Sequence, residues 1–324
     1  MTAKLSPVIE SAPDAFAREG AWQWVRRGGR APIAVEPLKP PRRKSAVYLL
    51  RDALPAGDVV AKRAARETLS IERHAYRVLD RLPVENVRCL GYANDRDEGY
   101  GWLFTAHSAG ASFSRADATH RTTAAHWLAS VHVAAAPFAR QVDLPSRDAA
   151  YYRSVVDAAR AEISRHRENP ALTPDDHAVL DAITARCCSM MARWREVERI
   201  CDCLPTTLVH GGFGSKNVRI VERPHGGASA VAFDWEAAGW GTPAADISGV
   251  DIDAYSAAVA TEWQVDPRAL HRLAALGTVF WALSAIPGES RSLASAWPHR
   301  VMSKMRAYLR RMDDAAEQLD GAVW

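Results

Sequence analysis

The sequence predicts an α+β fold with β-strands in the first third of its 324 residues and helices over most of the remainder. Apolar runs bounded by turn residues predict strands at 46–50, 59–62 and 100–105. Apolar residues at helical spacing predict helices within 66–81, 121–135, 150–197 and 253–318. With 48% hydrophobic residues, a chain of this length can bury a substantial core.

The first two strands and the next helix place a lysine and a glutamate in a recognisable order. A turn at 52–58, with Pro55 and Gly57, separates the strands, and the second strand ends in Val-Val-Ala-Lys at Lys62. On the helix at 66–81, Glu72 precedes the apolar stripe that includes Ala75, so its side chain is expected on the inner face as the partner of Lys62. The alternative places Lys62 at an exposed strand end and Glu72 on a solvated helix face.

The remaining helices follow start and stop signals. The strand at 100–105 runs into His107, and the helix at 121–135 follows. Asn169-Pro170 and Thr173-Pro174 interrupt the helical region at 150–197. In the helical region at 253–318, three tryptophans are expected in the core: Trp263, Trp281 and Trp297. A short helix near 16–25 is expected to pack on the strands.

The most informative segment runs from residue 208 to 246. His210-Gly211-Gly212 is followed by Asn217, an apolar strand, a Pro-His-Gly-Gly turn and a second apolar strand that ends at Asp234. Two strands joined by such a turn bring Asn217 and Asp234 to one place. An amide and a carboxylate held together in this way suit a metal site for phosphoryl transfer. In the alternative reading, His210 and Asp234 are hydrogen-bonded turn residues of an ordinary α+β domain.

This segment resembles the catalytic core of the aminoglycoside and choline kinase-like phosphotransferases. That family writes His-Gly-Asp, four residues and Asn, which the chain matches at His210, Gly211, Phe213 and Asn217, with Gly212 in place of the aspartate. The later Asp234-Trp235-Glu236 and Asp246 also follow the family pattern.

The resemblance implies a bilobal, protein kinase-like fold. A small antiparallel-sheet N-lobe is expected at 35–106, after an N-terminal extension at 1–34. A mainly helical C-lobe is expected at 107–324, with a helical insert at about 150–200 that forms the acceptor site.

The resemblance also implies roles for individual residues. Lys62, paired with Glu72, would bind the phosphates of ATP or another nucleoside triphosphate, and Asn217 and Asp234 would bind Mg²⁺. His210 belongs to the catalytic loop, and Gly212 occupies the position of the missing general base. Backbone groups of three consecutive residues would bind the base of the nucleotide: Thr105, Ala106 and His107.

Two functions remain open because of Gly212. In one, the protein is a phosphotransferase of reduced activity that acts on a hydroxyl of a small molecule or peptide, with Glu236, Asp246 or the substrate replacing the base. In the other, it is a pseudokinase that binds nucleotide or acts as a scaffold beside a partner enzyme, in a natural-product or peptide-modification pathway.

The composition narrows the partners and the location. The net charge of +3 requires neither nucleic acid nor a membrane surface as a partner. The first twenty residues contain acids and prolines where a signal peptide would be apolar, so a cytoplasmic protein is expected. The five cysteines have spacings that suit neither a disulfide framework nor a zinc site, so reduced thiols are expected.

Overall fold

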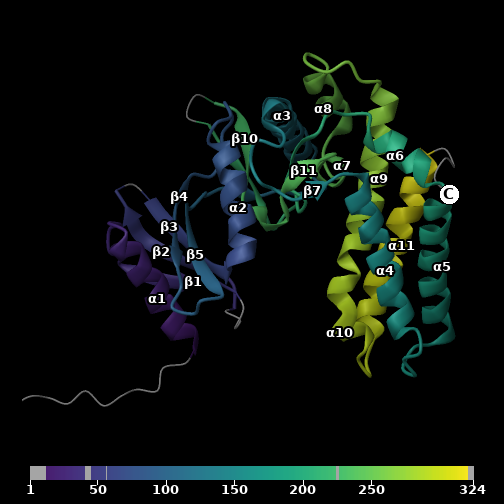
Figure 1. The fold of residues 1–324 in the computed structure, drawn as a ribbon, viewed down its shortest axis with the longest axis horizontal. Helices are drawn as coiled ribbons and strands as arrows, with labels where there is room; N and C mark the ends of the chain where they lie inside the picture. Colours follow the sequence, from purple (N-terminus) through teal and green to yellow (C-terminus); the bar gives the residue numbers. More distant parts are fainter. Residues whose placement is uncertain (1–11, 41–44, 56, 224–225, 320–324) are drawn as a thin grey trace, which may run out of the picture. The chain divides into compact units, whose positions relative to one another are not determined.

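A computed structural model describes residues 12–40, 45–55, 57–223 and 226–319 (Figure 1). The chain forms two compact units. Unit 1 consists of Met1–Asp80 and Glu85–Ala109, and unit 2 consists of Arg81–Val84 and Gly110–Trp324. An antiparallel sheet dominates unit 1 and helices dominate unit 2, so the predicted α+β, kinase-like fold class is confirmed.

Unit 1 contains a five-stranded sheet whose neighbouring strands are all antiparallel. Its strands, in spatial order, are β1 (Ala34–Pro37), β2 (Ala46–Leu54), β3 (Gly57–Ala65), β5 (Tyr100–Ala106) and β4 (Cys89–Asn94). The prediction missed β1 and β4 and made the β2–β3 turn too long. The ladder continues to the Leu54–Gly57 pair through an irregularity where Asp52 has a φ of 52°. The loop before β2 includes the basic residues Arg42, Arg43 and Lys44, which lie outside the described residues.

Helix α1 (Ala12–Arg26) packs on one face of this sheet and confirms the short helix expected there. The core on this face includes Trp24 of α1 and the alternating residues Tyr48, Leu50, Trp102 and Phe104 of β2 and β5.

Helix α2 (Arg66–Leu79) contacts β3, β4 and β5 (Figure 1). Ala61 of β3 belongs to the core beside α1. Because successive side chains of a strand point to opposite faces, its neighbour Lys62 points to the other face. The apolar stripe of α2 is buried, and Glu72 is buried with it. The strand and the helix therefore bring Lys62 and Glu72 together.

Unit 2 contains nearly all of the remaining helices. Their bounds are α3 (Ala118–Ala135), α4 (Ala149–His166), α5 (Pro174–Ala192), α6 (Trp194–Cys201), α7 (Ala244–Ile247), α8 (Ile252–Val259), α9 (Pro267–Ala285), α10 (Ser290–Leu293) and α11 (His299–Gln318). Side-chain oxygens cap the first turns of five of them: Asp117, Asp148, Thr173, Asp251 and Asp266. Thr173 and Asp176 form a full capping box, as the predicted helix start at this point requires.

Two small sheets in unit 2 support the region around residues 208–246. The first has the order β10 (Ala228–Ala232), β9 (Val218–Glu222), β6 (Ala111–Ser112). The second has the order β7 (Ser146–Arg147), β11 (Gly239–Gly241), β8 (Thr207–Val209). Short 3₁₀ helices occur at Ala136–Phe138, Trp235–Ala237 and Pro287–Glu289.

Helix α9 forms the centre of the helical part and contacts α7 and α11. Gly277 permits this packing, because a Cβ there would lie 1.8 Å from the carbonyl oxygen of Ala244. The segment Pro267–Leu293 is long and apolar enough to span a membrane, and 56% of its most apolar window is buried inside the structure. Trp297, expected in the core, is 76% exposed, so that prediction is wrong.

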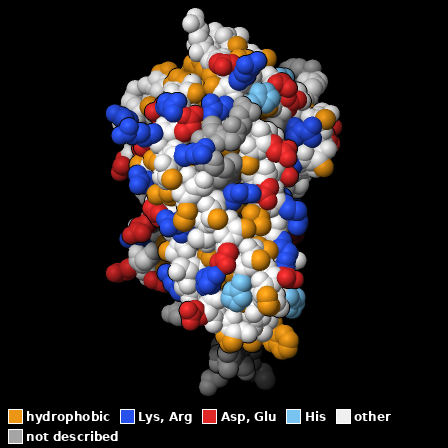
Figure 2. Space-filling model, turned by 90° about the vertical axis from the view of Figure 1, so that its right-hand side faces the viewer, with side chains coloured by type: hydrophobic (Ala, Val, Ile, Leu, Met, Phe, Trp, Pro, Cys, Tyr) orange, Lys and Arg blue, Asp and Glu red, His pale blue; other side chains and the backbone are white. Residues whose placement is uncertain are grey.

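The surface of the helical part is mixed in charge. Figure 2 shows acidic and basic side chains interspersed with small apolar areas over one face.

Candidate functional site

The β9–β10 ribbon places Asn217 beside Asp234. Its last ladder pair is Val218–Ala232, and the backbone N–H of Phe233 donates to the Asn217 carbonyl at 3.0 Å. Asp234 follows directly in a left-handed conformation, with φ 66° and ψ 54°, which turns the chain into the Trp235–Ala237 3₁₀ helix. The predicted juxtaposition of the two residues is therefore present, while their binding of a metal stays a prediction. Pro224 and His225 of the predicted turn lie outside the described residues.

His210 is buried and fixes the loop that precedes this ribbon. Its Nδ1 accepts a hydrogen bond from the backbone N–H of Gly212 at 3.1 Å, so the proton is on Nε2, which donates to the Phe233 carbonyl at 3.1 Å. Burial lowers the pKa of His210, which favours this neutral form. With both ring nitrogens engaged, His210 positions the loop and is unsuited to be a general base.

Gly211 and Gly212 differ in whether their positions require a glycine. Gly211 has a φ of 74°, and a Cβ there would lie 2.5 Å from the carbonyl oxygen of Ala237, so this position requires glycine. At Gly212 φ lies outside the left-handed region, and a Cβ would lie 3.5 Å from Nδ2 of Asn217 and 3.7 Å from Nδ1 of His210. These are ordinary contacts. The fold accommodates a side chain at position 212, where the sequence has none.

Asn217 closes the loop from its other end. Its Nδ2 donates to the Gly212 carbonyl at 3.1 Å, and its backbone N–H donates to the Gly214 carbonyl at 2.9 Å. The loop thus keeps a defined set of hydrogen bonds without the aspartate. The amide oxygen of Asn217 is the atom left for a cation.

Asp246 of α7 is buried beneath this loop and was wrongly considered as a replacement base. One carboxylate oxygen accepts the backbone N–H of His210 at 2.6 Å, and the other accepts that of Gly211 at 2.9 Å. At 1% exposure, with both oxygens engaged, it has no access to an acceptor hydroxyl. Its role is to hold the loop.

His132 lies next to Asp246 and is hydrogen-bonded to Tyr255, and the sequence patterns did not connect these two residues to the site. His132 Nε2 lies 3.8 Å from an Asp246 oxygen, and His132 Nδ1 lies 2.9 Å from the Tyr255 hydroxyl. Both are fully buried.

Unit 1 carries the second group of predicted residues. Lys62 Nζ lies 2.8 Å from Glu72 Oε2, which confirms the predicted ion pair. The Glu72 side chain is 2% exposed and that of Lys62 is 13% exposed. A buried carboxylate requires such a partner, whereas an exposed pair would contribute little.

The backbone at Thr105, Ala106 and His107 has fewer open donors than expected for nucleotide recognition. The N–H of Ala106 donates to the Arg88 carbonyl at 2.9 Å, and the N–H of His107 donates to the Asp58 carbonyl at 3.0 Å. Thr105 is buried within the ladder. Recognition of a base by these three residues stays a prediction, and it would have to use carbonyl oxygens or exchange an existing hydrogen bond.

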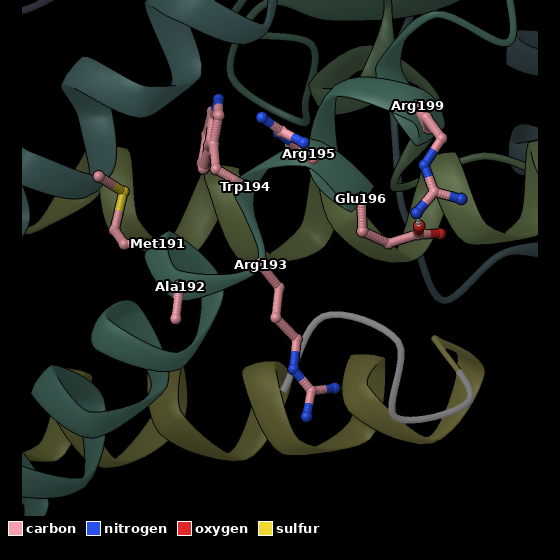
Figure 3. Close-up of a pocket in the computed structure, with 7 residues that line it drawn as sticks. All are labelled: Met191, Ala192, Arg193, Trp194, Arg195, Glu196 and Arg199. Atoms are coloured by element: carbon pink, nitrogen blue, oxygen red, sulfur yellow. Dashed lines mark ion pairs between the residues drawn. The ribbon is translucent and has the colours of Figure 1, made fainter.

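Two buried acids of the helical insert expected to form the acceptor site have structural partners. The Asp176 carboxylate accepts the backbone N–H of Thr173 in the capping box of α5 and binds Arg306 at 2.5 Å, and Glu162 pairs with Arg165 at 2.6 Å. A pocket of about 470 Å³ at the α5–α6 junction is lined by Met191, Ala192, Arg193, Trp194, Arg195, Glu196 and Arg199. Figure 3 shows Arg193 extending away from Trp194 and Arg195, so the basic side chains do not converge on one point.

The described part of the chain contains no group of three or more His, Cys, Asp or Glu residues that could hold a metal ion. The five cysteines are free thiols. Burial raises the pKa of Cys187 to about 12, so this thiol is an inert core residue.

Solved structures show the same fold at low sequence identity. The GDP complex of wild-type aminoglycoside 2'-phosphotransferase-IIIa has a TM-score of 0.65 at 13% identity, covering 93% of this chain and 99% of that one. Spectinomycin phosphotransferase in complex with ADP and spectinomycin gives 0.59 at 10%, covering 93% and 97%. Choline kinase from Cryptosporidium parvum Iowa II gives 0.57 at 13%, covering 88% and 90%. No curated protein sequence matches the chain.

The family model covers most of the chain. The model described as "Phosphotransferase enzyme family" matches residues 42–284, a range that includes Lys62, the loop at His210 and the β9–β10 ribbon. The chain therefore belongs to the phosphotransferase enzyme family.

Proposed function

We propose that the protein transfers a phosphoryl group from ATP, or another nucleoside triphosphate, to a hydroxyl of a small molecule or peptide. The observation that carries this proposal is the β9–β10 ribbon, which holds Asn217 beside Asp234 at the end of an ordered loop. The family membership supports it, as do the GDP and ADP complexes of proteins with the same fold.

Each residue has a role that its surroundings support. Lys62, oriented by Glu72, binds phosphate oxygens of the nucleotide. The amide oxygen of Asn217 and the carboxylate of Asp234 bind Mg²⁺, which prefers oxygen ligands. When bound, the metal neutralises charge on the phosphates.

The loop at His210 holds its residues in place but supplies no strong base. His210 is neutral with both nitrogens engaged, and Asp246 is buried with both oxygens engaged. Glu236, an exposed carboxylate two residues after Asp234, is the remaining base candidate from the sequence. A general base contributes about 10²–10⁴-fold, while positioning and electrostatics carry most of phosphoryl transfer, so a slow enzyme is expected.

Nucleotide binding is the first experiment. Mg-ATP should raise the melting temperature of the full chain, and ATP without magnesium should raise it less, because a ligand of the native state stabilises by mass action. Asp234→Ala should remove the magnesium dependence. The absence of any shift at millimolar Mg-ATP, or an undiminished magnesium dependence in the variant, contradicts the proposal.

The second candidate function is a pseudokinase, and Gly212 is the observation that favours it. In this case the protein binds Mg-ATP through the same residues and acts on a partner enzyme. Nucleotide binding without turnover, both in the wild type and in Gly212→Asp, would support this function over catalysis.

A further inference from the structure

Two arginines from distant parts of unit 2 meet at one tryptophan. The guanidinium carbon of Arg115, in the loop between β6 and α3, lies 5.4 Å from the centre of the Trp281 ring. That of Arg311, on α11, lies 4.6 Å from the same centre. Tyr308, one turn before Arg311, meets the indole edge to face at 6.0 Å. These contacts hold both guanidinium groups in place.

Neither arginine has an acidic partner. Within the described ranges, no carboxylate forms an ion pair with Arg115 or Arg311, and neither guanidinium donates a hydrogen bond. Nearby arginines differ: Arg306 of α11 binds Asp176, and Arg186 binds Asp313 of α11 at 2.8 Å. Arg115 and Arg311 therefore differ from these two arginines, which have acidic partners.

The pair is electrostatically unfavourable as it stands. Burial lowers the pKa of Arg115, and the charge of Arg311 lowers it further. Withdrawing a guanidinium from water beside a like charge costs free energy unless an anion compensates. A carboxylate or phosphate bound by both arginines would supply this compensation, since guanidinium groups match the geometry of those anions.

The pair also lies close to the candidate catalytic loop within the same unit. A Cβ at Gly249 would lie 2.5 Å from Nε of Arg115, so the side chain rests directly on this glycine. Gly249 follows Asp246, which holds the loop, by three residues, a path of at most about 11 Å between Cα atoms. Trp281 lies one helical turn after Gly277, where α9 packs on α7.

We propose that Arg115, Arg311 and Trp281 form a subsite that binds a carboxylate or phosphate group of the acceptor. This inference rests on the proposed function, because it assigns the acceptor an anionic group. A cationic acceptor would be repelled at this position. The aromatic ring orients the two guanidinium groups, and the anion bridges them.

Anion binding can be measured without any turnover, so its failure is distinguishable from failure of phosphoryl transfer. The probes are inorganic phosphate and citrate at constant ionic strength. The readouts are the melting temperature and the indole N–H signal of Trp281, assigned in the NMR spectrum with Trp281→Phe. Binding should raise the melting temperature and shift this signal. The anion with the higher affinity identifies the group recognised.

Arginine variants locate the binding. Arg115→Gln and Arg311→Gln should each weaken binding by at least about tenfold, as expected for loss of one charged hydrogen-bonding partner. The matched control is Arg310→Gln, the exposed neighbour on α11, which should bind as the wild type does. If Arg115→Gln does not fold, Arg311→Gln carries the test, since its side chain is exposed. Wild-type affinity in folded Arg311→Gln overturns the proposal.

Two further variants separate this subsite from the nucleotide site and from simple charge effects. Lys62→Met/Glu72→Leu should keep the phosphate response, and loss of the response there would place the anion at the nucleotide site and overturn the proposal. Arg311→Glu should abolish the response and raise the melting temperature in anion-free buffer, because a glutamate can pair with Arg115. An unchanged response in this variant also overturns the proposal.

Discussion

Restoring a carboxylate at position 212 is the most direct perturbation of the site. In Gly212→Asp, the new Cβ would lie 3.5 Å from Nδ2 of Asn217, which is close enough for the carboxylate to receive a hydrogen bond from that amide after a small rotation. The backbone there needs no left-handed φ, and Asp246 already holds the two preceding residues. The variant should therefore fold, with a free energy of unfolding within about 1 kcal/mol of wild type.

The expected gain in rate follows from the role of a general base. A positioned base contributes about 10²–10⁴-fold, which corresponds to roughly 3–5 kcal/mol of transition-state stabilisation. The assay is release of ADP from Mg-ATP, with the acceptor if one is known and with water otherwise. Melting temperatures with and without Mg-ATP, recorded on the same preparations, establish that the variant is folded and binds nucleotide.

Neighbouring positions provide matched controls. Gly212→Ala adds the same Cβ without a carboxylate and should not accelerate turnover. Gly214→Asp adds the carboxylate two residues away, where a Cβ meets nothing within 4 Å, and should leave the rate unchanged. Gly211→Ala should destabilise the fold by about 1–3 kcal/mol, because its φ is 74° and the Ala237 carbonyl blocks a Cβ. A Gly212→Asp variant that folds and binds nucleotide, and yet turns over no faster than Gly212→Ala, would show that position 212 is not the vacant base site.

Further predictions concern the ion pair, the buried aspartate and the buried histidine. Lys62→Met should destabilise the protein by about 3–5 kcal/mol, because it leaves Glu72 buried and unpaired. Lys62→Met/Glu72→Leu should recover most of that stability without recovering Mg-ATP binding. Urea unfolding measures the stability of both variants, and ATP titration measures their binding. Asp246→Asn should lower the free energy of unfolding by about 1.5–3 kcal/mol, because an amide cannot accept both backbone N–H groups; an unchanged urea midpoint contradicts this. Because the pKa of His210 is lowered in the folded protein, the His210 imidazole of the unfolded chain is protonated first as the pH falls. The free energy of unfolding should therefore decline as the pH falls below 6.5. His210→Asn should flatten this decline between about pH 7 and pH 5, and an equal slope in urea unfolding would assign it to other groups.

Local patterns in the sequence were sufficient for much of the fold. The alternation in β2, β3 and β5 and the helical spacing in α2 and α3 gave correct element types, because burial on one face leaves a period in the sequence. Strand β1 was missed because it is a short edge strand with mostly exposed residues. Trp297 was misplaced because a large apolar residue in a helical region is not necessarily buried.

In the candidate site too, features set by neighbouring residues could be predicted from the sequence, and features set by distant residues could not. The pairing of Asn217 with Asp234 could be predicted because a short turn joins the two strands that carry them. Asp246 was recognised as part of the motif, but not its function, since that depends on which backbone N–H groups lie above it in the folded chain. The arginine pair at Trp281 could not be predicted, because residues 115, 281 and 311 are far apart in the sequence and no local pattern joins them.

The ion pair in unit 1 bears on whether the protein binds a nucleotide. A buried pair is weak evidence for stability, because replacing both partners with apolar residues is commonly neutral or stabilising. Glu72 is 2% exposed and Lys62 only 13%, so the pair carries a desolvation cost. The loop carries a similar desolvation cost, because His210 and Asp246 are buried polar residues whose hydrogen bonds order the backbone around Gly212. Such costs are understandable if these groups orient a nucleotide. The buried ion pair and the ordered loop therefore favour nucleotide binding in both functional candidates, and turnover in Gly212→Asp is the measurement that separates them.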